Sequence, residues 1–167
     1  HTWLASGWSV VERLNVLSVN LRNLELSNTI SQNFENFTKN NINELVSLDK
    51  SIFDPYWQNS EAAFIETLDS CNQNYLFKQY DEDLLVGYAI LGVTRNFSFL
   101  QRFGISLGYQ NKGHGSELLK NVLSFAKDNK YTNIRLNTQE NNKAAKSLYV
   151  KHGFELTKTN FTILNAS

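Results

Sequence analysis

The sequence is short of the residues that carry redox and metal chemistry. Among 167 residues it has one cysteine, Cys71, and no methionine. A lone cysteine excludes a disulfide within the chain, so we predict that Cys71 is a packing residue in a protein of a reducing compartment. No group of cysteine and histidine residues has the spacing of a metal site, and we expect no metal. Because the initiator methionine is missing, we treat residue 1 as an internal position.

The sequence also has no excess of positive or negative charge and no long apolar run. Sixteen basic residues balance sixteen acidic ones. The broad positive field that general nucleic-acid binding needs is therefore absent, and a helix-turn-helix protein is disfavoured. No apolar run approaches the roughly 18 residues of a membrane span, and the first residues do not form a signal peptide. We expect a cytoplasmic protein without a membrane partner. Its hydrophobic content of 41% suits one globular domain.

The chain is predicted to have three parts. Residues 1–24 form an N-terminal strand segment, because β-branched residues recur there with a period near two. Residues 25–40 are polar and form a connection, and residues 41–167 form the main domain. Residues 4–10 weakly resemble residues 149–154, since both run from a helix end through glycine and an aromatic residue. This suggests the hypothesis that the first part is the remnant of a longer chain.

Periodicity and turn residues predict the elements of the main domain. A helix over residues 41–52 ends before Asp54-Pro55, since the residue before proline avoids helical geometry. Ser60 is predicted to cap a second, short helix that ends near Cys71. An antiparallel meander, a long amphipathic helix, a strand, a helix and a last strand follow. Their predicted positions are 75–80, 84–93 and 97–106 for the meander, then 115–129, 133–138, 142–152 and the residues after Gly153.

A glycine-containing loop joins the meander to the long helix. It reads Gln110-Asn111-Lys112-Gly113-His114-Gly115-Ser116. Free N–H groups at a helix start favour an anion such as phosphate, and glycines let a ligand approach the backbone. The Lys-Ser/Thr pair of a P-loop and the third glycine of a dinucleotide fingerprint are both missing. Taken alone, the loop is either a binding loop or an ordinary tight turn.

Two motifs make the chain resemble the GNAT superfamily of N-acetyltransferases. Gln110-x-x-Gly113-x-Gly115 is similar to its acetyl-CoA signature, Gln/Arg-x-x-Gly-x-Gly/Ala. Asn142-x-x-Ala145-x-x-Leu148-Tyr149-x-x-x-Gly153-Phe154 matches its C-terminal signature. The resemblance covers about residues 40–160 and is closest to bacterial enzymes of the ribosomal-protein-alanine type. It implies an α/β (α+β) fold, with a mixed, mostly antiparallel twisted sheet that is splayed at the cofactor slot and flanked by helices.

The resemblance implies acetyl-CoA as co-substrate. Its pyrophosphate would lie on the backbone amides of the loop, its pantetheine arm would run beside the preceding strand, and the cap of the later helix would contact it. The implied binding residues are Phe103, Gly104, Ile105, Asn111, Lys112, Gly113, His114, Gly115, Ser116 and Asn142. Leu107 replaces a proline that is frequent in the family, which leaves the register of the preceding turn open.

Tyr149 stands where the family places a phenol that donates a proton to the departing thiolate of CoA. A half-buried core tyrosine is the alternative interpretation. The resemblance further implies direct transfer to a primary amine, either a protein N-terminus or a small molecule, by a monomer or homodimer. Asp54, Tyr56 and Trp57 occupy the region that commonly forms the acceptor wall, although an aromatic clasp on the core explains them equally well.

The group that deprotonates the amine is not evident. The splayed strand over residues 97–106 has no carboxylate, and Asn137 stands where related enzymes can have glutamate. Glu140 is the nearest carboxylate in sequence and is interpreted as a loop residue. We therefore predict a water relay. The missing carboxylate also keeps open a non-catalytic acetyl-CoA-binding sensor.

Overall fold

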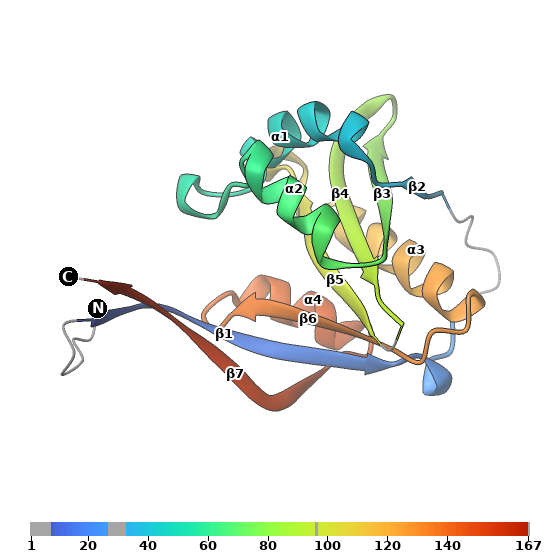
Figure 1. The fold of residues 1–167 in the computed structure, drawn as a ribbon. Coiled ribbons are helices and arrows are strands. Elements are labelled where there is room, and N and C mark those ends of the chain that lie inside the picture. Colours follow the sequence, from blue (N-terminus) through green and yellow to red (C-terminus); the bar gives the residue numbers. More distant parts are fainter. Residues whose placement is uncertain (1–7, 27–32, 96, 167) are drawn as a thin grey trace.

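Seven strands form one sheet, in the order β2-β3-β4-β5-β6-β1-β7, in the computed structural model, which describes residues 8–26, 33–95 and 97–166 (Figure 1). Strands β5 and β6 pair in parallel, and the other neighbouring pairs are antiparallel. The predicted mixed, mostly antiparallel sheet is confirmed. The strands are β1 (Trp8–Asn20), β2 (Glu35–Asn36), β3 (Gln73–Asp81), β4 (Leu84–Val93), β5 (Ser98–Ile105), β6 (Asn133–Gln139) and β7 (Glu155–Ala166).

The four α-helices of the described residues begin and end where the sequence predicts, within a few residues. They are α1 (Ile42–Lys50), α2 (Glu61–Ser70), α3 (His114–Asp128) and α4 (Lys143–Lys151). Ser60 caps α2, because its hydroxyl accepts a hydrogen bond from the amide of Ala63 at 3.1 Å. The short turn Pro55–Trp57 separates α1 from α2, as the proline predicts.

The helices divide between the two faces of the sheet (Figure 1), and the described residues form a hydrophobic core on each face. Successive side chains of the central strands point to opposite faces of the sheet and so contribute to both cores. Leu76, Tyr88 and Ile90 face α1 and α2. Phe77 and Leu91 face the opposite side, where they join the core formed with α3. No helix in the described part of the chain covers the α2-side face of β6, β1 and β7 (Figure 1).

The opening strand β1 lies inside the sheet, between β6 and β7. Leu17 pairs with Leu136 on one side and with Leu156 on the other. Leu17 and Val19 are buried in the core shared with α3, so β1 belongs to the main sheet. Residues 4–7 of the weak repeat noted in the sequence lie outside the described residues.

A bulge in β5 opens the middle of the sheet. Gln101 has no partner on β4, because Ile90 pairs with Arg102 while Leu91 pairs with Leu100. Within the described residues, β5 pairs with β6 only at Phe99 and Leu100 and then diverges from it. Bulges bend a strand and end its pairing in this way. The result is a slot between β5 and β6 beyond Leu100.

No helix in the described ranges is long and apolar enough to cross a membrane.

Candidate functional site

A cleft of about 580 Å³ lies where the end of β5 meets the first turns of α3 and α4. The loop before α3 bends sharply, since Asn111 and Gly113 both have positive φ, +63° and +88°. Glycine adopts this geometry without strain. The Gln110 side chain ties the loop back to the strand, because its Nε2 donates to the carbonyl of Ile105 at 3.0 Å.

The first turn of α3 is open to a ligand. Gly113 is the cap residue and has no side chain to satisfy the free amides, whereas Ser60 caps α2 and Asn142 caps α4. The N–H groups at the start of α3 therefore have no side-chain acceptor from a capping residue, and they lie beside the cleft. Free amides and the helix dipole together favour an anion at this point.

Most of the predicted site residues line this one cleft. Those that do are Asp54, Trp57, Phe103, Gly104, Ile105, Asn111, Gly113, Gly115, Ser116, Asn142 and Tyr149. Three do not. The Lys112 ammonium lies 5.3 Å from the centre of the Tyr109 ring, the His114 ring lies 3.8 Å from Asp81, and Tyr56 is 62% exposed. Any role of Lys112 and His114 in binding would thus be through their backbone amides.

Tyr149 lies at the inner end of the cleft. Its ring packs edge-on between Phe103 and Phe154, with ring centres 5.8 and 5.6 Å away. Only 7% of the residue is exposed, and burial raises the pKa of its phenol. The hydroxyl has no hydrogen-bond partner among the described residues. It is therefore a protonated phenol available to a ligand in the cleft.

A histidine contacts the wall of the cleft that the first turn of α3 forms. His152 follows α4, and its Nε2 lies 3.1 Å from the hydroxyl of Ser116 in the first turn of α3. Burial lowers the pKa of His152, and Lys120 and Lys151 lower it further. The imidazole is therefore neutral at pH 7, and it links the two helices that form the cleft.

A buried ion pair fixes the loop between α1 and α2 onto β5. Asp49, which is fully buried, receives two hydrogen bonds from Arg102, at 3.0 and 2.7 Å. The hydroxyl of Tyr88 donates to the same carboxylate at 2.5 Å. Arg102 also donates to the carbonyl of Trp57 and stacks 3.8 Å from the Phe53 ring centre. Arg102, the residue after the bulge, thus anchors the α1–α2 loop, which forms one wall of the cleft.

The buried tyrosines predict a loss of stability in alkali. Burial and the carboxylate of Asp49 raise the pKa of Tyr88, and burial raises that of Tyr149. Their contribution is present below the unfolded pKa of about 10 and is lost as the pH rises above it. At pH 11 each tyrosine should cost roughly 1.4 kcal/mol of unfolding free energy relative to pH 8. Urea unfolding of the parent and of Tyr88→Phe at pH 8 and pH 11 measures this loss of unfolding free energy. The Tyr88→Phe variant should lose about 1.4 kcal/mol less than the parent, and an equal loss in both would contradict the assignment.

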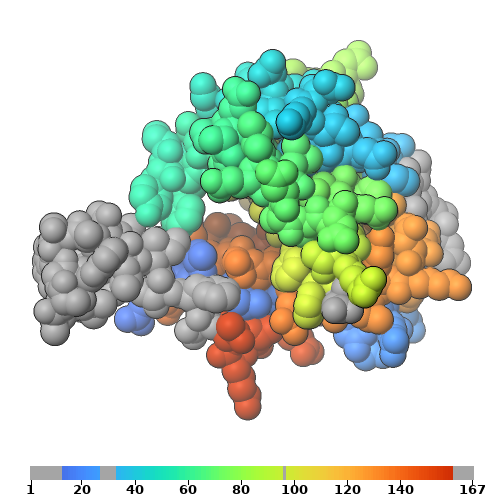
Figure 2. Space-filling view, viewed as in Figure 1, coloured from blue at the N-terminus to red at the C-terminus, as the bar shows by residue number. Residues whose placement is uncertain are grey.

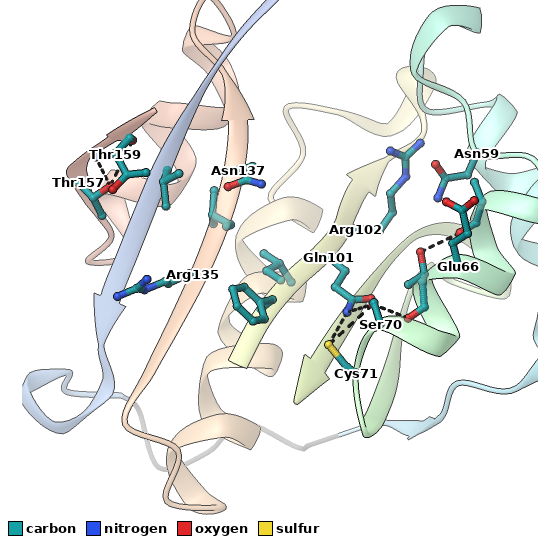
Figure 3. Close-up of a pocket in the computed structure, with 16 residues that line it drawn as sticks. Asn59, Glu66, Ser70, Cys71, Gln101, Arg102, Arg135, Asn137, Thr157 and Thr159 are labelled. Carbon is teal, nitrogen blue, oxygen red and sulfur yellow. Dashed lines mark hydrogen bonds between the residues drawn. The ribbon is translucent and has the colours of Figure 1, made fainter. Parts of the chain in front are cut away.

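A second cavity, a groove of about 740 Å³, opens on the α2 face of the sheet. Figure 2 shows the molecule hollowed beneath α2, with β6 and β1 below. Helix α2 forms one wall, β5 the back, and β6 and β7 the other side (Figure 3). Arg102 lines the groove while its neighbour Phe103 lines the first cleft. The two cavities therefore meet β5 at neighbouring residues.

The sequence did not reveal this groove. Among its described lining residues the one carboxylate is Glu66. Asn137, which stands where related enzymes can have glutamate, also lines the groove. Glu140 lines neither cavity. The available signal was the spacing of Ala63, Glu66, Thr67 and Ser70, which places these small and polar residues on one side of the helix.

Comparisons with known proteins agree with this arrangement. The model of the acetyltransferase (GNAT) family matches residues 42–154. An uncharacterized N-acetyltransferase of Bacillus subtilis, YobR, is 26% identical over 113 residues, which are 68% of this chain and 44% of that protein.

Solved structures share the fold. A functionally unknown protein of Staphylococcus epidermidis has a TM-score of 0.69 at 20% identity, over 96% of this chain and 63% of its own. An N-acetyltransferase of Thermoplasma acidophilum in complex with coenzyme A has a TM-score of 0.60 at 16% identity, over 81% of this chain and 98% of its own. The chain thus spans less than two thirds of YobR and of the staphylococcal protein.

Proposed function

Because the chain belongs to the acetyltransferase (GNAT) family, we propose that it transfers the acetyl group of acetyl-CoA directly to a primary amine. The observation that carries the proposal is the uncapped start of α3 beside a sheet that opens between β5 and β6. The helix start suits a pyrophosphate, and the opening between β5 and β6 is where an acyl group would meet an amine.

The cleft fits acetyl-CoA in shape and chemistry. The pyrophosphate would accept hydrogen bonds from the amides of residues 111–116. The pantetheine arm would run beside Phe103, Gly104 and Ile105, since this stretch of β5 has no partner on β6 among the described residues. The acetyl group would then reach the slot near Tyr149. A fold neighbour that holds coenzyme A supports this choice of co-substrate.

In the proposed reaction the amine nitrogen attacks the thioester carbonyl. The new C–N bond forms as the C–S bond breaks, and the departing thiolate takes a proton from the Tyr149 hydroxyl. The burial that raises the pKa of this phenol keeps the proton in place at neutral pH. Solvent then restores the proton.

The acceptor arrives as an ammonium ion and must lose a proton before it can attack. The carboxylates that line the two cavities, Asp54 and Glu66, lie on the α1–α2 loop and on α2 rather than on β5 or β6. We therefore propose that water in the slot relays the proton to solvent. The acceptor itself, a protein N-terminus or a small amine, would enter from the groove on the α2 face.

Binding and turnover test the proposal together. Acetyl-CoA at one hundred times its Kd should stabilise the fold by about 2.7 kcal/mol, which corresponds to a Tm increase of roughly 5–10 °C for a chain of this size. Free thiol should also appear when amines are added. Thermal stabilisation without thiol release from any amine would favour the acetyl-CoA-binding sensor, and the absence of both would end the proposal.

A pair of glycine variants localises the binding. A β-carbon at Gly115 would lie 3.2 Å from Leu148, at the edge of the cleft, whereas one at Gly108 would meet nothing within 4 Å. Gly115→Val should therefore abolish the thermal shift, while Gly108→Ala retains it. Equal shifts in both variants would place the ligand elsewhere.

A further inference from the structure

The groove on the α2 face presents polar groups that the fold leaves free. Glu66 and Asn59 lie together on the side of α2, and Asn137 and Thr159 lie across from them on β6 and β7 (Figure 3). The four side-chain heads have no hydrogen-bond partner in the described part of the chain. Glu66, Asn137 and Thr159 are exposed. Amide, hydroxyl and carboxylate groups thus lie on both sides of the groove.

Most of the other polar side chains of the groove are occupied by the fold. The exceptions are Arg135, whose guanidinium lies 5.9 Å from the centre of the Phe97 ring, and the Oε1 of Gln101, which has no hydrogen-bond partner among the described residues. Arg102 is bound to Asp49. The hydroxyl of Ser70 donates to the carbonyl of Thr67 and accepts from Gln101. Thr157 is bonded to the backbone of Thr159. The groups that the fold leaves free are thus mainly amides, a hydroxyl and one carboxylate, with one guanidinium from Arg135.

From this set we infer that the amine acceptor is a small molecule that carries several hydroxyl groups, such as an amino sugar. The inference rests on the proposed acetyl transfer. Neutral amides and hydroxyls donate and accept hydrogen bonds as sugar hydroxyls do, and the single carboxylate, Glu66, suits one ammonium group. The half-buried ring of Phe99 at the back of the groove offers a surface for the apolar side of a sugar ring.

Other amine classes fit less well. A polyamine needs several carboxylates, but the groove has Glu66 as its one described acidic residue and is also lined by Arg102 and Arg135. A peptide needs pockets for its side chains. The aliphatic residues Val16, Leu100 and Leu136 are only 3–7% exposed and offer little surface.

Paired substrates and paired variants test the inference. Thiol release is measured with glucosamine and with cyclohexylamine, a six-membered ring without hydroxyls, for the parent and for Asn137→Ala. The loss caused by the variant is compared between the two amines, so their different basicities cancel. We expect kcat/KM for glucosamine to fall at least tenfold and that for cyclohexylamine less than twofold, because a site built for hydroxyl groups loses most with the substrate that has them.

A charge-matched pair completes the test. Glu66→Gln should raise KM for glucosamine at least tenfold, while Asp69→Asn, on the same helix but outside the groove, should leave it unchanged. Equal losses for both amines, or no loss with either groove variant, overturn the inference. Turnover of spermidine or of an alanine-terminated peptide with a higher kcat/KM than glucosamine overturns it as well, although acetyl transfer then stands. If no amine releases thiol, the proposed function fails and the inference fails with it.

Discussion

Replacing Tyr149 by phenylalanine is expected to lower kcat about 100-fold, the smaller end of the range for losing a general acid. The variant keeps the ring between Phe103 and Phe154, so packing is preserved and only the proton donor is removed. The thiolate of CoA must then leave unprotonated or take its proton from water. Steady-state thiol release measures kcat, and the thermal shift with acetyl-CoA should stay close to that of the parent.

Tyr80→Phe is the matched control. Tyr80 is 47% exposed on β3 and lines neither cavity, so its loss should leave kcat unchanged. A Tyr149→Phe enzyme with parental kcat would remove the phenol from the mechanism and return Tyr149 to the role of a core residue. A loss of the thermal shift together with kcat would point to cofactor binding instead.

Removing the buried carboxylate in Asp49→Ala is expected to destabilise the fold by about 3–5 kcal/mol, since it leaves the buried guanidinium of Arg102 unpaired. The Tyr88 hydroxyl loses its acceptor in the same step. Urea unfolding measures the change, and the Tm should fall by roughly 10 °C. Because Arg102 also holds the Trp57 carbonyl, one wall of the cleft should loosen.

A second ion pair on α1 is the control. Glu44 is 2.7 Å from Lys78, but its side chain is 52% exposed, so Glu44→Ala should cost less than about 1 kcal/mol. Removing both buried charges, Asp49→Leu with Arg102→Met, should recover most of the stability lost in Asp49→Ala. Equal losses in Asp49→Ala and Glu44→Ala would show that the buried pair adds nothing beyond a surface pair.

Local chemistry made much of the fold predictable. The cap at Ser60, the stop at Pro55 and the alternation of β3 and β4 act between neighbours in sequence, and the elements lie where these signals place them. The loop at Gln110 to Gly115 was ambiguous by itself, and the motif from Asn142 onward is what tied it to acetyl-CoA. The structure brings the two motifs to one cleft.

Long-range features could not be predicted in this way. The periodicity of residues 9–21 indicates a strand but contains nothing about its partners, so the position of β1 between β6 and β7 was not foreseen. Nothing in the sequence around Asp49 indicates that its carboxylate is buried. Its burial depends on Arg102 and Tyr88, which are distant in sequence. The groove around Glu66 likewise exists only once α2, β6 and β7 are in place.

The position of β1 has a consequence for how the chain folds. This strand precedes the other described elements in sequence, whereas its hydrogen-bonding partners lie far along the chain, from Asn133 onward. Pairs so distant in sequence form slowly, because the intervening chain must be ordered first. Until then β1 has two unpaired edges, the state in which strands join the wrong partner. The meander β3-β4-β5 can form early, but β7 cannot join the sheet without β1. Completion of the sheet beside β6 therefore waits for β1 to pair with β6 and β7.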